Sequence, residues 1–310
     1  MILGCSNTTA QTAFTLPQIN FTPMTIADTH VHIYPCFDLE EFLVHACRNL
    51  DRCAEPLRIA AANQPLPARV LYLAESAGCH WFQEAIHGRI APPHGWTLRF
   101  GETARCVTFS HAEHGEIHIV PGRQMATAER LEVLGLAMDA TVPDRLSLRE
   151  TLTRIETAGG TPVVPWAVGK WLFSRGRAID SLLHASSPDS LLLGDSAMRP
   201  APGPLPRLMR LAVKLGFGVA AGSDPLPLPG EERLVGTFAV FMKTRFAPEA
   251  PADLLRNLFQ NQPPHAGGQI VGHRRSYGSV LLKTVQLRFA KKTPPLKEHG
   301  QQDQSHSNHE

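Results

Sequence analysis

Short apolar segments alternate with amphipathic segments along most of this chain, and this alternation constrains its fold more than any other feature of the sequence. Apolar runs of about four to eight residues that are bounded by Gly, Pro or polar residues predict buried strands, whereas longer amphipathic runs predict helices. Strands that alternate with helices in this way form a parallel sheet that the helices cover. The segments that we predict to be strands are residues 25–34, 68–75, 131–138, 162–167, 190–195 and 217–224.

Polar side chains collect at the carboxyl ends of these segments, which is typical of a (β/α) barrel. We therefore predict an α/β fold with a single barrel domain over residues 25–292, including a C-terminal helical region from about residue 227. A doubly wound open sheet is the alternative, although the chain contains no Gly-x-Gly-x-x-Gly or Walker A loop. Residues 1–24 are predicted to be an irregular leader and residues 293–310 a disordered tail.

Helices are predicted between most of the strands. The first follows Asp38, whose side chain can cap it, and Pro56 is expected to break the chain after it. A β-hairpin is predicted over residues 107–119. The later helices are predicted at residues 148–158, 176–185, 206–215, 231–243, 251–260 and 279–292.

The composition argues against several classes of partner. The 310 residues include 30 Lys and Arg against 28 Asp and Glu, and a formal charge of +2 indicates no general affinity for nucleic acid or an anionic membrane. The six cysteines form no Cys-x-x-Cys pair, which is typical of free thiols in a reducing compartment. No stretch is long and apolar enough to cross a bilayer, and residues 1–24 lack the pattern of a signal peptide. We therefore expect a cytoplasmic protein of undetermined oligomeric state.

The first predicted strand carries the clearest chemical signal, Asp28-Thr29-His30-Val31-His32. Side chains two residues apart leave the same face of a strand, so the imidazoles of His30 and His32 are expected side by side. Neutral imidazole is the commonest protein metal ligand, and two on one face form half of a chelate. Two ordinary polar residues at a strand end are the alternative, which we rank lower here. Asp28 shares this face, and its carboxylate is expected to orient an imidazole.

Carboxylates at other strand ends are the candidates for completing this site: Glu75, Asp195 and Asp224. A barrel assembles strand ends from distant parts of a sequence into one site. Two imidazoles with two or three carboxylates suit a divalent Zn, Mn or Fe ion, which would polarise a phosphoryl or carbonyl oxygen and acidify a bound water. Capping of the following helices is the other interpretation of Asp195 and Asp224. Lys170 and Arg199 follow strand ends and are candidates for binding a phosphate or carboxylate, against a default of surface positions.

Several segments resemble motifs of the PHP (polymerase and histidinol phosphatase) family, in the family's order, over residues 25–240. Asp28-Thr29-His30-Val31-His32 resembles the opening Asp-x-His-x-His, and residues 221–224 resemble the closing Gly-Ser-Asp-x-His. Residues 119–124 are similar to the Pro-Gly-x-Glu segment, and residues 148–164 to the helix and strand before Ala-His-Pro. The resemblance implies a distorted (β/α)7 TIM-like barrel of the PHP type, up to three metals and, in many members, phosphoesterase activity.

The chain departs from this family at four ligand positions. Ala74-Glu75-Ser76 stands where the family has Thr-Asp-His, and Gln124 replaces a bridging Glu, although a neutral amide is a far weaker metal ligand than a carboxylate. Trp166 replaces the His of Ala-His-Pro, and Leu226 replaces the closing His. The resemblance therefore implies fewer ions than a trinuclear cluster. The ligand positions that match are His30, His32 and Asp224.

Three functions are consistent with these residues. The first is a metal-dependent hydrolase of the phosphoesterase kind, with one metal, Glu75 or Asp195 completing the site, and a small, phosphorylated molecule as the substrate class. The second is a catalytically inactive PHP-like barrel that binds a ligand or partner, which the four replaced positions favour. The third is an amidohydrolase-type barrel, which also opens with His-x-His and closes with a strand-end Asp. We rank it last because that superfamily supplies histidines where this chain has Trp166 and Asp195, and we predict the first.

Overall fold

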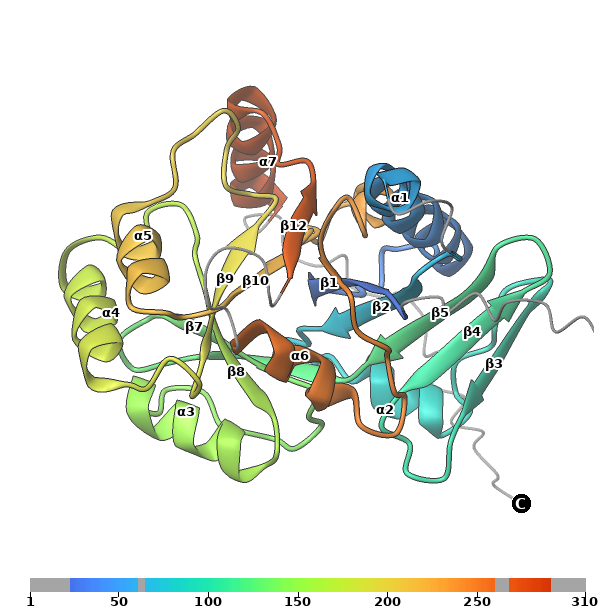
Figure 1. The fold of residues 1–310 in the computed structure, drawn as a ribbon, viewed down its shortest axis with the longest axis horizontal. Helices are drawn as coiled ribbons and strands as arrows, with labels where there is room; N and C mark the ends of the chain where they lie inside the picture. The colour runs from blue at the N-terminus through green and yellow to red at the C-terminus, as the bar shows by residue number, and fades with distance from the viewer. Residues whose placement is uncertain (1–22, 61–64, 260–267, 291–310) are drawn as a thin grey trace, which may run out of the picture.

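A computed structural model describes residues 23–60, 65–259 and 268–290. The predicted leader up to residue 22 and the predicted tail lie outside the described residues. The described chain is a mixture of helices and two β-sheets, so the predicted α/β class is confirmed (Figure 1).

Two sheets form the centre of the molecule. The first contains, in spatial order, β12 (Gln269–Gly272), β11 (Phe238–Met242), β1 (Thr25–Val31), β2 (Ala68–Leu73), β5 (Gly115–Val120), β4 (Val107–His111) and β3 (Trp96–Phe100). The second contains β10 (Val219–Gly222), β9 (Leu192–Ser196), β8 (Thr161–Pro165), β7 (Glu132–Leu136) and β6 (Gly122–Ala126). The strands β1, β2 and β5 run parallel, as do β8, β9 and β10, whereas β7 runs antiparallel to both of its neighbours.

The two sheets touch at both ends of the second sheet. Beside β1, the Asp224 amide donates to the His30 carbonyl at 2.9 Å. Beside β2, the Glu75 amide donates to the Gly122 carbonyl at 3.0 Å. The approach of β10 to β1 requires Gly222, because a Cβ there would lie 2.4 Å from the His30 nitrogen. The strands of the described chain nevertheless form two sheets rather than one closed sheet, so the predicted barrel is not confirmed.

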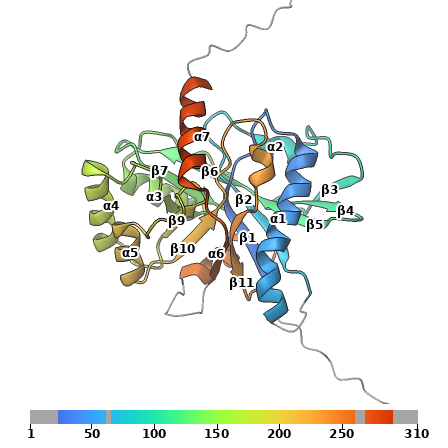
Figure 2. The same cartoon turned by 90° about the horizontal axis from the view of Figure 1, so that it is seen from above.

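Helices cover the outer faces of both sheets (Figures 1 and 2). One hydrophobic core lies between the first sheet and α1, a second lies where the two sheets face each other, and a third packs α3, α4 and α5 onto the second sheet. None of the helices in the described ranges has the length and apolar character needed to span a bilayer. The helices are α1 (Leu39–Ala60), α2 (Trp81–Ile86), α3 (Leu148–Thr157), α4 (Phe173–Ala185), α5 (Arg207–Lys214), the short 3-10 helix η1 (Glu231–Leu234), α6 (Pro251–Phe259) and α7 (Tyr277–Ala290).

Two local predictions are wrong. Pro56 does not break the chain, because α1 continues through it to Ala60 and Leu57 still packs on the core beyond it. The predicted helix at 231–243 is instead η1 followed by strand β11, every residue of which is buried between β1 and β12. A short, continuously apolar run does not distinguish a buried strand from a buried helix. The predicted hairpin is confirmed as β4 and β5.

Candidate metal centre

The end of β1 holds the two histidines of the opening motif. His30 is within the strand and His32 follows its last residue, and both side chains are buried. Their Nε2 atoms are 3.2 Å apart, so the two rings point to one place as the two-residue spacing predicts. Tyr34 continues the alternation and stacks on His32, with ring centroids 5.3 Å apart and an interplanar angle of 21°. The described structure therefore has the imidazole pair that the sequence predicts.

Asp224 reaches this pair from the second sheet, two residues after β10. Its Oδ1 lies 3.6 Å from Nε2 of His30 and 3.8 Å from Nε2 of His32. Asp224 has a left-handed backbone with φ of 49°, a conformation that Asp tolerates better than most residues. The Ser196 hydroxyl donates to the other carboxylate oxygen, Oδ2, at 3.0 Å, and this hydrogen bond helps to fix the orientation of the carboxylate.

The charges of these three side chains suit metal binding. Burial, together with neighbouring His30, lowers the pKa of His32 to about 3, so this ring is neutral at pH 7. Burial opposes ionisation of Asp224, but the nearby histidines and the Ser196 hydroxyl hold the pKa of Asp224 below its usual value. Two nitrogen donors and one carboxylate are a ligand set that divalent zinc, manganese and iron accept.

The distances among the three ligand atoms also fit a metal. His30 Nε2, His32 Nε2 and Asp224 Oδ1 are separated by 3.2, 3.6 and 3.8 Å. A circle through three points with these spacings has a radius of about 2.1 Å, which is within the usual range of zinc–nitrogen and zinc–oxygen bonds. Within the described residues, these three form the only group of His, Cys, Asp or Glu side chains with such spacing. The centre is therefore a group of three potential ligands with the spacing that one metal ion requires.

Asp28 has a different set of contacts from the one predicted. Its carboxylate accepts hydrogen bonds from three backbone amides, those of His30 at 3.2 Å, Ser223 at 2.9 Å and Gly236 at 2.9 Å. Complete burial raises the pKa of Asp28 to about 6 despite these bonds. Asp28 thus joins β1 to the segments after β10 and before β11, and its hydrogen bonds are made to backbone rather than to an imidazole ring.

Glu75 lies at the end of β2 but is not part of the three-residue group. Its Oε1 accepts from the Phe82 amide at 2.9 Å, and its Oε2 lies 3.4 Å from Nη1 of Arg123. Burial raises the pKa of Glu75, although the Phe82 amide and Arg123 act in the opposite direction. Arg123 also lies 3.4 Å from the Asp139 carboxylate. Glu75 therefore belongs to a buried ionic cluster beside the centre.

The remaining predicted residues pair with one another or with other acids. Asp195 accepts two hydrogen bonds from Arg199, from Nε at 2.7 Å and from Nη2 at 2.6 Å, and both side chains are buried. Lys170 forms an ion pair with Glu132. The structure thus brings the predicted metal ligand Asp195 to the predicted anion-binding residue Arg199, and both lie outside the metal-ligand group.

Glu231 is a supporting residue that the sequence interpretation missed. Its carboxylate is 1% exposed and accepts from Arg275 Nη2 at 2.7 Å, Lys283 Nζ at 3.1 Å and the Leu226 amide at 3.2 Å. Burial opposes ionisation, yet Arg275 holds the pKa of Glu231 below its usual value. The bond to Leu226 fixes the chain just after Asp224. No local motif signals this network, because its members are separated by many residues.

Ser196 was also missed, although strand alternation could have identified it. It follows Asp195 in β9, so its side chain points to the opposite face from the Asp195–Arg199 pair.

Replacing Ser196 with alanine removes the only side-chain hydrogen bond to Asp224 found in the described structure. We expect the variant to bind a divalent metal about 10 to 100 times more weakly, as is usual when a metal ligand loses its outer partner. Calorimetric titration of chelator-treated protein measures this, and unchanged affinity would exclude the supporting role.

Comparisons with known proteins place this fold among several solved structures. No protein-family model matches the chain, and no curated protein matches it. PsfC from Pseudomonas syringae is similar over 87% of this chain and 98% of its own, with 14% identity and a TM-score of 0.45. Endonuclease Q, solved with a 27-mer duplex that carries an abasic lesion, is similar over 79% of this chain and 58% of its own, with 10% identity and a TM-score of 0.43.

A third structure carries the family name that the sequence motifs predict. It is a two-domain protein from Bacteroides vulgatus that contains a predicted PHP-like metal-dependent phosphoesterase. The similarity covers 86% of this chain and 70% of that protein, with 11% identity and a TM-score of 0.41. The PHP name that the sequence motifs predict therefore recurs in the description of one structural neighbour. Because identities and TM-scores are this low, the function proposed below rests on the geometry of the metal centre and on the sequence motifs.

Proposed function

We propose that this protein is a metal-dependent hydrolase of the phosphoesterase kind, with one divalent ion bound by His30, His32 and Asp224. The observation that carries the proposal is the spacing of the three ligand atoms, which lets one ion lie at metal–ligand distance from all of them. Three protein ligands with a position left open are typical of catalytic rather than structural zinc sites. We further propose a small, phosphorylated molecule as the substrate and the cytoplasm as the compartment.

The chemistry follows from the residues around the centre. A divalent ion held there would polarise a phosphoryl oxygen and lower the pKa of a bound water towards neutrality. His32 contributes a neutral nitrogen because burial keeps it unprotonated. Asp224 contributes a negative charge. It is oriented by the Ser196 hydroxyl and by the hydrogen bond from its own backbone amide to the His30 carbonyl. Tyr34 restricts the His32 ring by stacking on it.

The reduced ligand set gives the other predicted residues supporting roles in this proposal. Arg199 neutralises Asp195, and Glu75 is engaged with Arg123, so we assign none of these a direct chemical step. Lys170 is paired with Glu132 and would bind a substrate anion only after leaving that partner. The proposed site therefore contains one ion rather than a trinuclear cluster.

We also infer that seven strands form a distorted barrel around the second core. The order β1, β2, β6, β7, β8, β9, β10 returns to β1 through the backbone contacts at the two ends of the second sheet. The joints are short hydrogen-bonded contacts rather than full strand pairing, which accounts for two separate sheets. This ring would bring strand ends together at one edge, as barrel active sites require.

A non-catalytic ligand- or partner-binding protein is the second candidate. The spacing of 3.2 Å between the two Nε2 atoms is also that of a hydrogen bond, so the two imidazoles can bond to each other without an ion. This alternative predicts the same buried contacts but no metal-dependent hydrolysis.

Removal and restoration of metal tests the proposal. We expect purified protein to hydrolyse at least one member of a panel of phosphomonoesters and phosphodiesters, to lose that activity after treatment with a chelator, and to regain it with zinc, manganese or iron(II). A carboxylester panel run in parallel checks the reaction class. Turnover that survives complete chelation, or a metal-loaded protein that hydrolyses no phosphoester, would contradict the proposal.

A further inference from the structure

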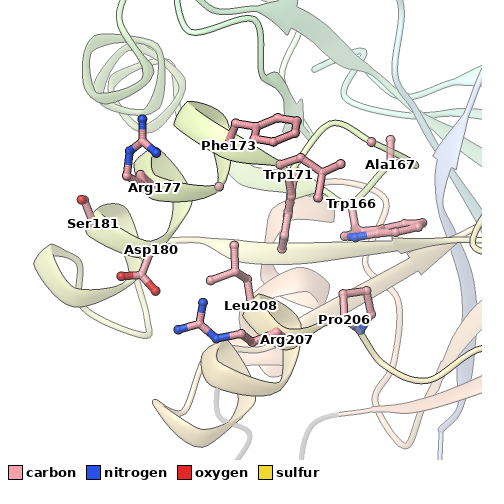
Figure 3. Close-up of a pocket in the computed structure, with 13 residues that line it drawn as sticks. Trp166, Ala167, Trp171, Phe173, Arg177, Asp180, Ser181, Pro206, Arg207 and Leu208 are labelled. Carbon is pink, nitrogen blue, oxygen red and sulfur yellow. The ribbon is translucent and has the colours of Figure 1, made fainter.

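A cavity lies between α4 and α5, and the three metal-centre residues do not line it. Its volume is about 680 Å³, which is within the usual range of small-molecule sites. Figure 3 shows Trp166 at one end, Arg177, Asp180 and Ser181 at the other, and Trp171 and Leu208 between them. None of its lining residues is His30, His32 or Asp224.

Aromatic side chains supply much of the wall of this cavity. Trp171 is 7% exposed, whereas Phe173 is 84% exposed although it lines the cavity. Trp166 adds a second, half-buried indole. Exposed aromatic faces around a cavity favour a planar ligand, because stacked or edge-to-face ring pairs contribute attraction beyond area burial.

The polar groups of the cavity favour negative charge. Both helices begin at it, α4 at Phe173 and α5 at Arg207, and neither has a side-chain cap or an acidic residue in its first turn. Amide groups at a helix N-terminus attract anions. Arg177 and Arg207 add two guanidinium groups, and neither makes a hydrogen bond or ion pair within the described chain. The acidic member of the lining, Asp180, lies 3.8 Å from His184.

The wall of the cavity also contains a buried donor without a partner in the described residues. The Nε1 atom of Trp171 is buried and has no hydrogen-bond acceptor in the described residues. An unsatisfied buried N–H is costly, but a ligand in the open cavity would contact the indole ring and not this enclosed atom. We propose that the cavity between α4 and α5 is a binding site for a small planar aromatic anion, with its ring against the aromatic wall and its charge towards the two helix N-termini.

The cavity lies near the metal centre but is separate from it. Trp166 directly follows β8, and β9 alone separates β8 from β10, the strand that precedes Asp224. Two strand spacings correspond to about 10 Å. The proposed binding requires no metal, so it is tested separately from hydrolysis.

Binding of 2-naphthylphosphonate to chelator-treated protein tests this site. This probe has a ring and a charge but no ester bond, and calorimetry and tryptophan fluorescence report its binding. We expect 1:1 binding, with naphthylmethanol and methylphosphonate each at least about 10 times weaker because they lack the charge or the ring. Equal affinity for naphthylmethanol, or no binding of the probe at millimolar concentration, would overturn the proposal.

Matched variants locate the probe. The double substitution Arg177→Gln and Arg207→Gln is expected to weaken binding by at least about 10-fold, whereas Arg149→Gln with Arg154→Gln, an equal charge change at exposed positions of α3, leaves it unchanged. His30→Ala retains wild-type binding. A wild-type affinity in the double arginine variant, or lost binding in His30→Ala, contradicts this location.

Discussion

Substitution of His30 or His32 by alanine is expected to lower metal-dependent turnover by more than about 100-fold and to lower metal content in parallel. Loss of an outer partner alone typically weakens metal binding by 10- to 100-fold, and loss of a direct ligand should exceed this. Each histidine supplies one of three ligand atoms, so its removal leaves two. Steady-state kinetics on the best phosphoester and elemental analysis of each variant measure both effects.

The matched control for these variants is His118→Ala. His118 is half-buried on β5 and bonds to the Thr108 hydroxyl at 2.9 Å, so its removal costs packing without touching the metal centre. We expect this variant to retain its metal and its turnover. Equal losses in His118→Ala and His30→Ala would show that the histidine effects arise from destabilisation and not from lost ligation.

The Arg199→Met variant is expected to lower the free energy of unfolding by about 3 to 5 kcal/mol, because it leaves the carboxylate of Asp195 buried without its partner. Asp195 is 3% exposed and accepts both of its strongest hydrogen bonds from Arg199. Urea denaturation followed by circular dichroism measures the change. Methionine preserves much of the packing of the arginine stem, so the charge is the main quantity altered.

A double variant separates the pair from its surroundings. Asp195→Asn keeps an acceptor for the Ser196 amide and removes the charge. Combined with Arg199→Met, it is expected to recover more than half of the lost stability, because replacing both members of a buried ion pair is far less costly than breaking it. If the two single effects simply add, the ion pair is not the source of the destabilisation. Full stability in Arg199→Met would show that the ion pair does not stabilise the fold.

Local sequence pattern was sufficient for most of the strands and helices but failed where burial in the folded chain decides the conformation. The runs at β8, β9 and β10 could be predicted because each is short, apolar and bounded by Gly, Pro or polar residues. The segment that forms β11 is equally apolar, and the helix prediction runs through Gly236, which separates η1 from β11 with φ of 78°. Its strand state depends on pairing with β1, more than 200 residues earlier in the chain, which no local pattern contains.

The candidate site could be predicted in the part that depends on strand geometry. The spacing of His30 and His32 fixes their common face, and a strand-end position makes Asp224 a candidate partner. The roles of Asp28 and Asp195 could not be predicted in this way, because partners from other segments determine them. Three backbone amides surround the first, and Arg199, four residues later, turns back onto the second.

The metal content of the protein, purified without chelator or metal-affinity resin, tests the central claim most directly. Elemental analysis is predicted to find about one zinc, manganese or iron ion per chain, and less than about one tenth of this in His32→Ala. Wild-type protein that contains no divalent metal and binds none on dialysis against micromolar zinc, manganese or iron(II) would contradict the assignment of His30, His32 and Asp224 as a metal centre.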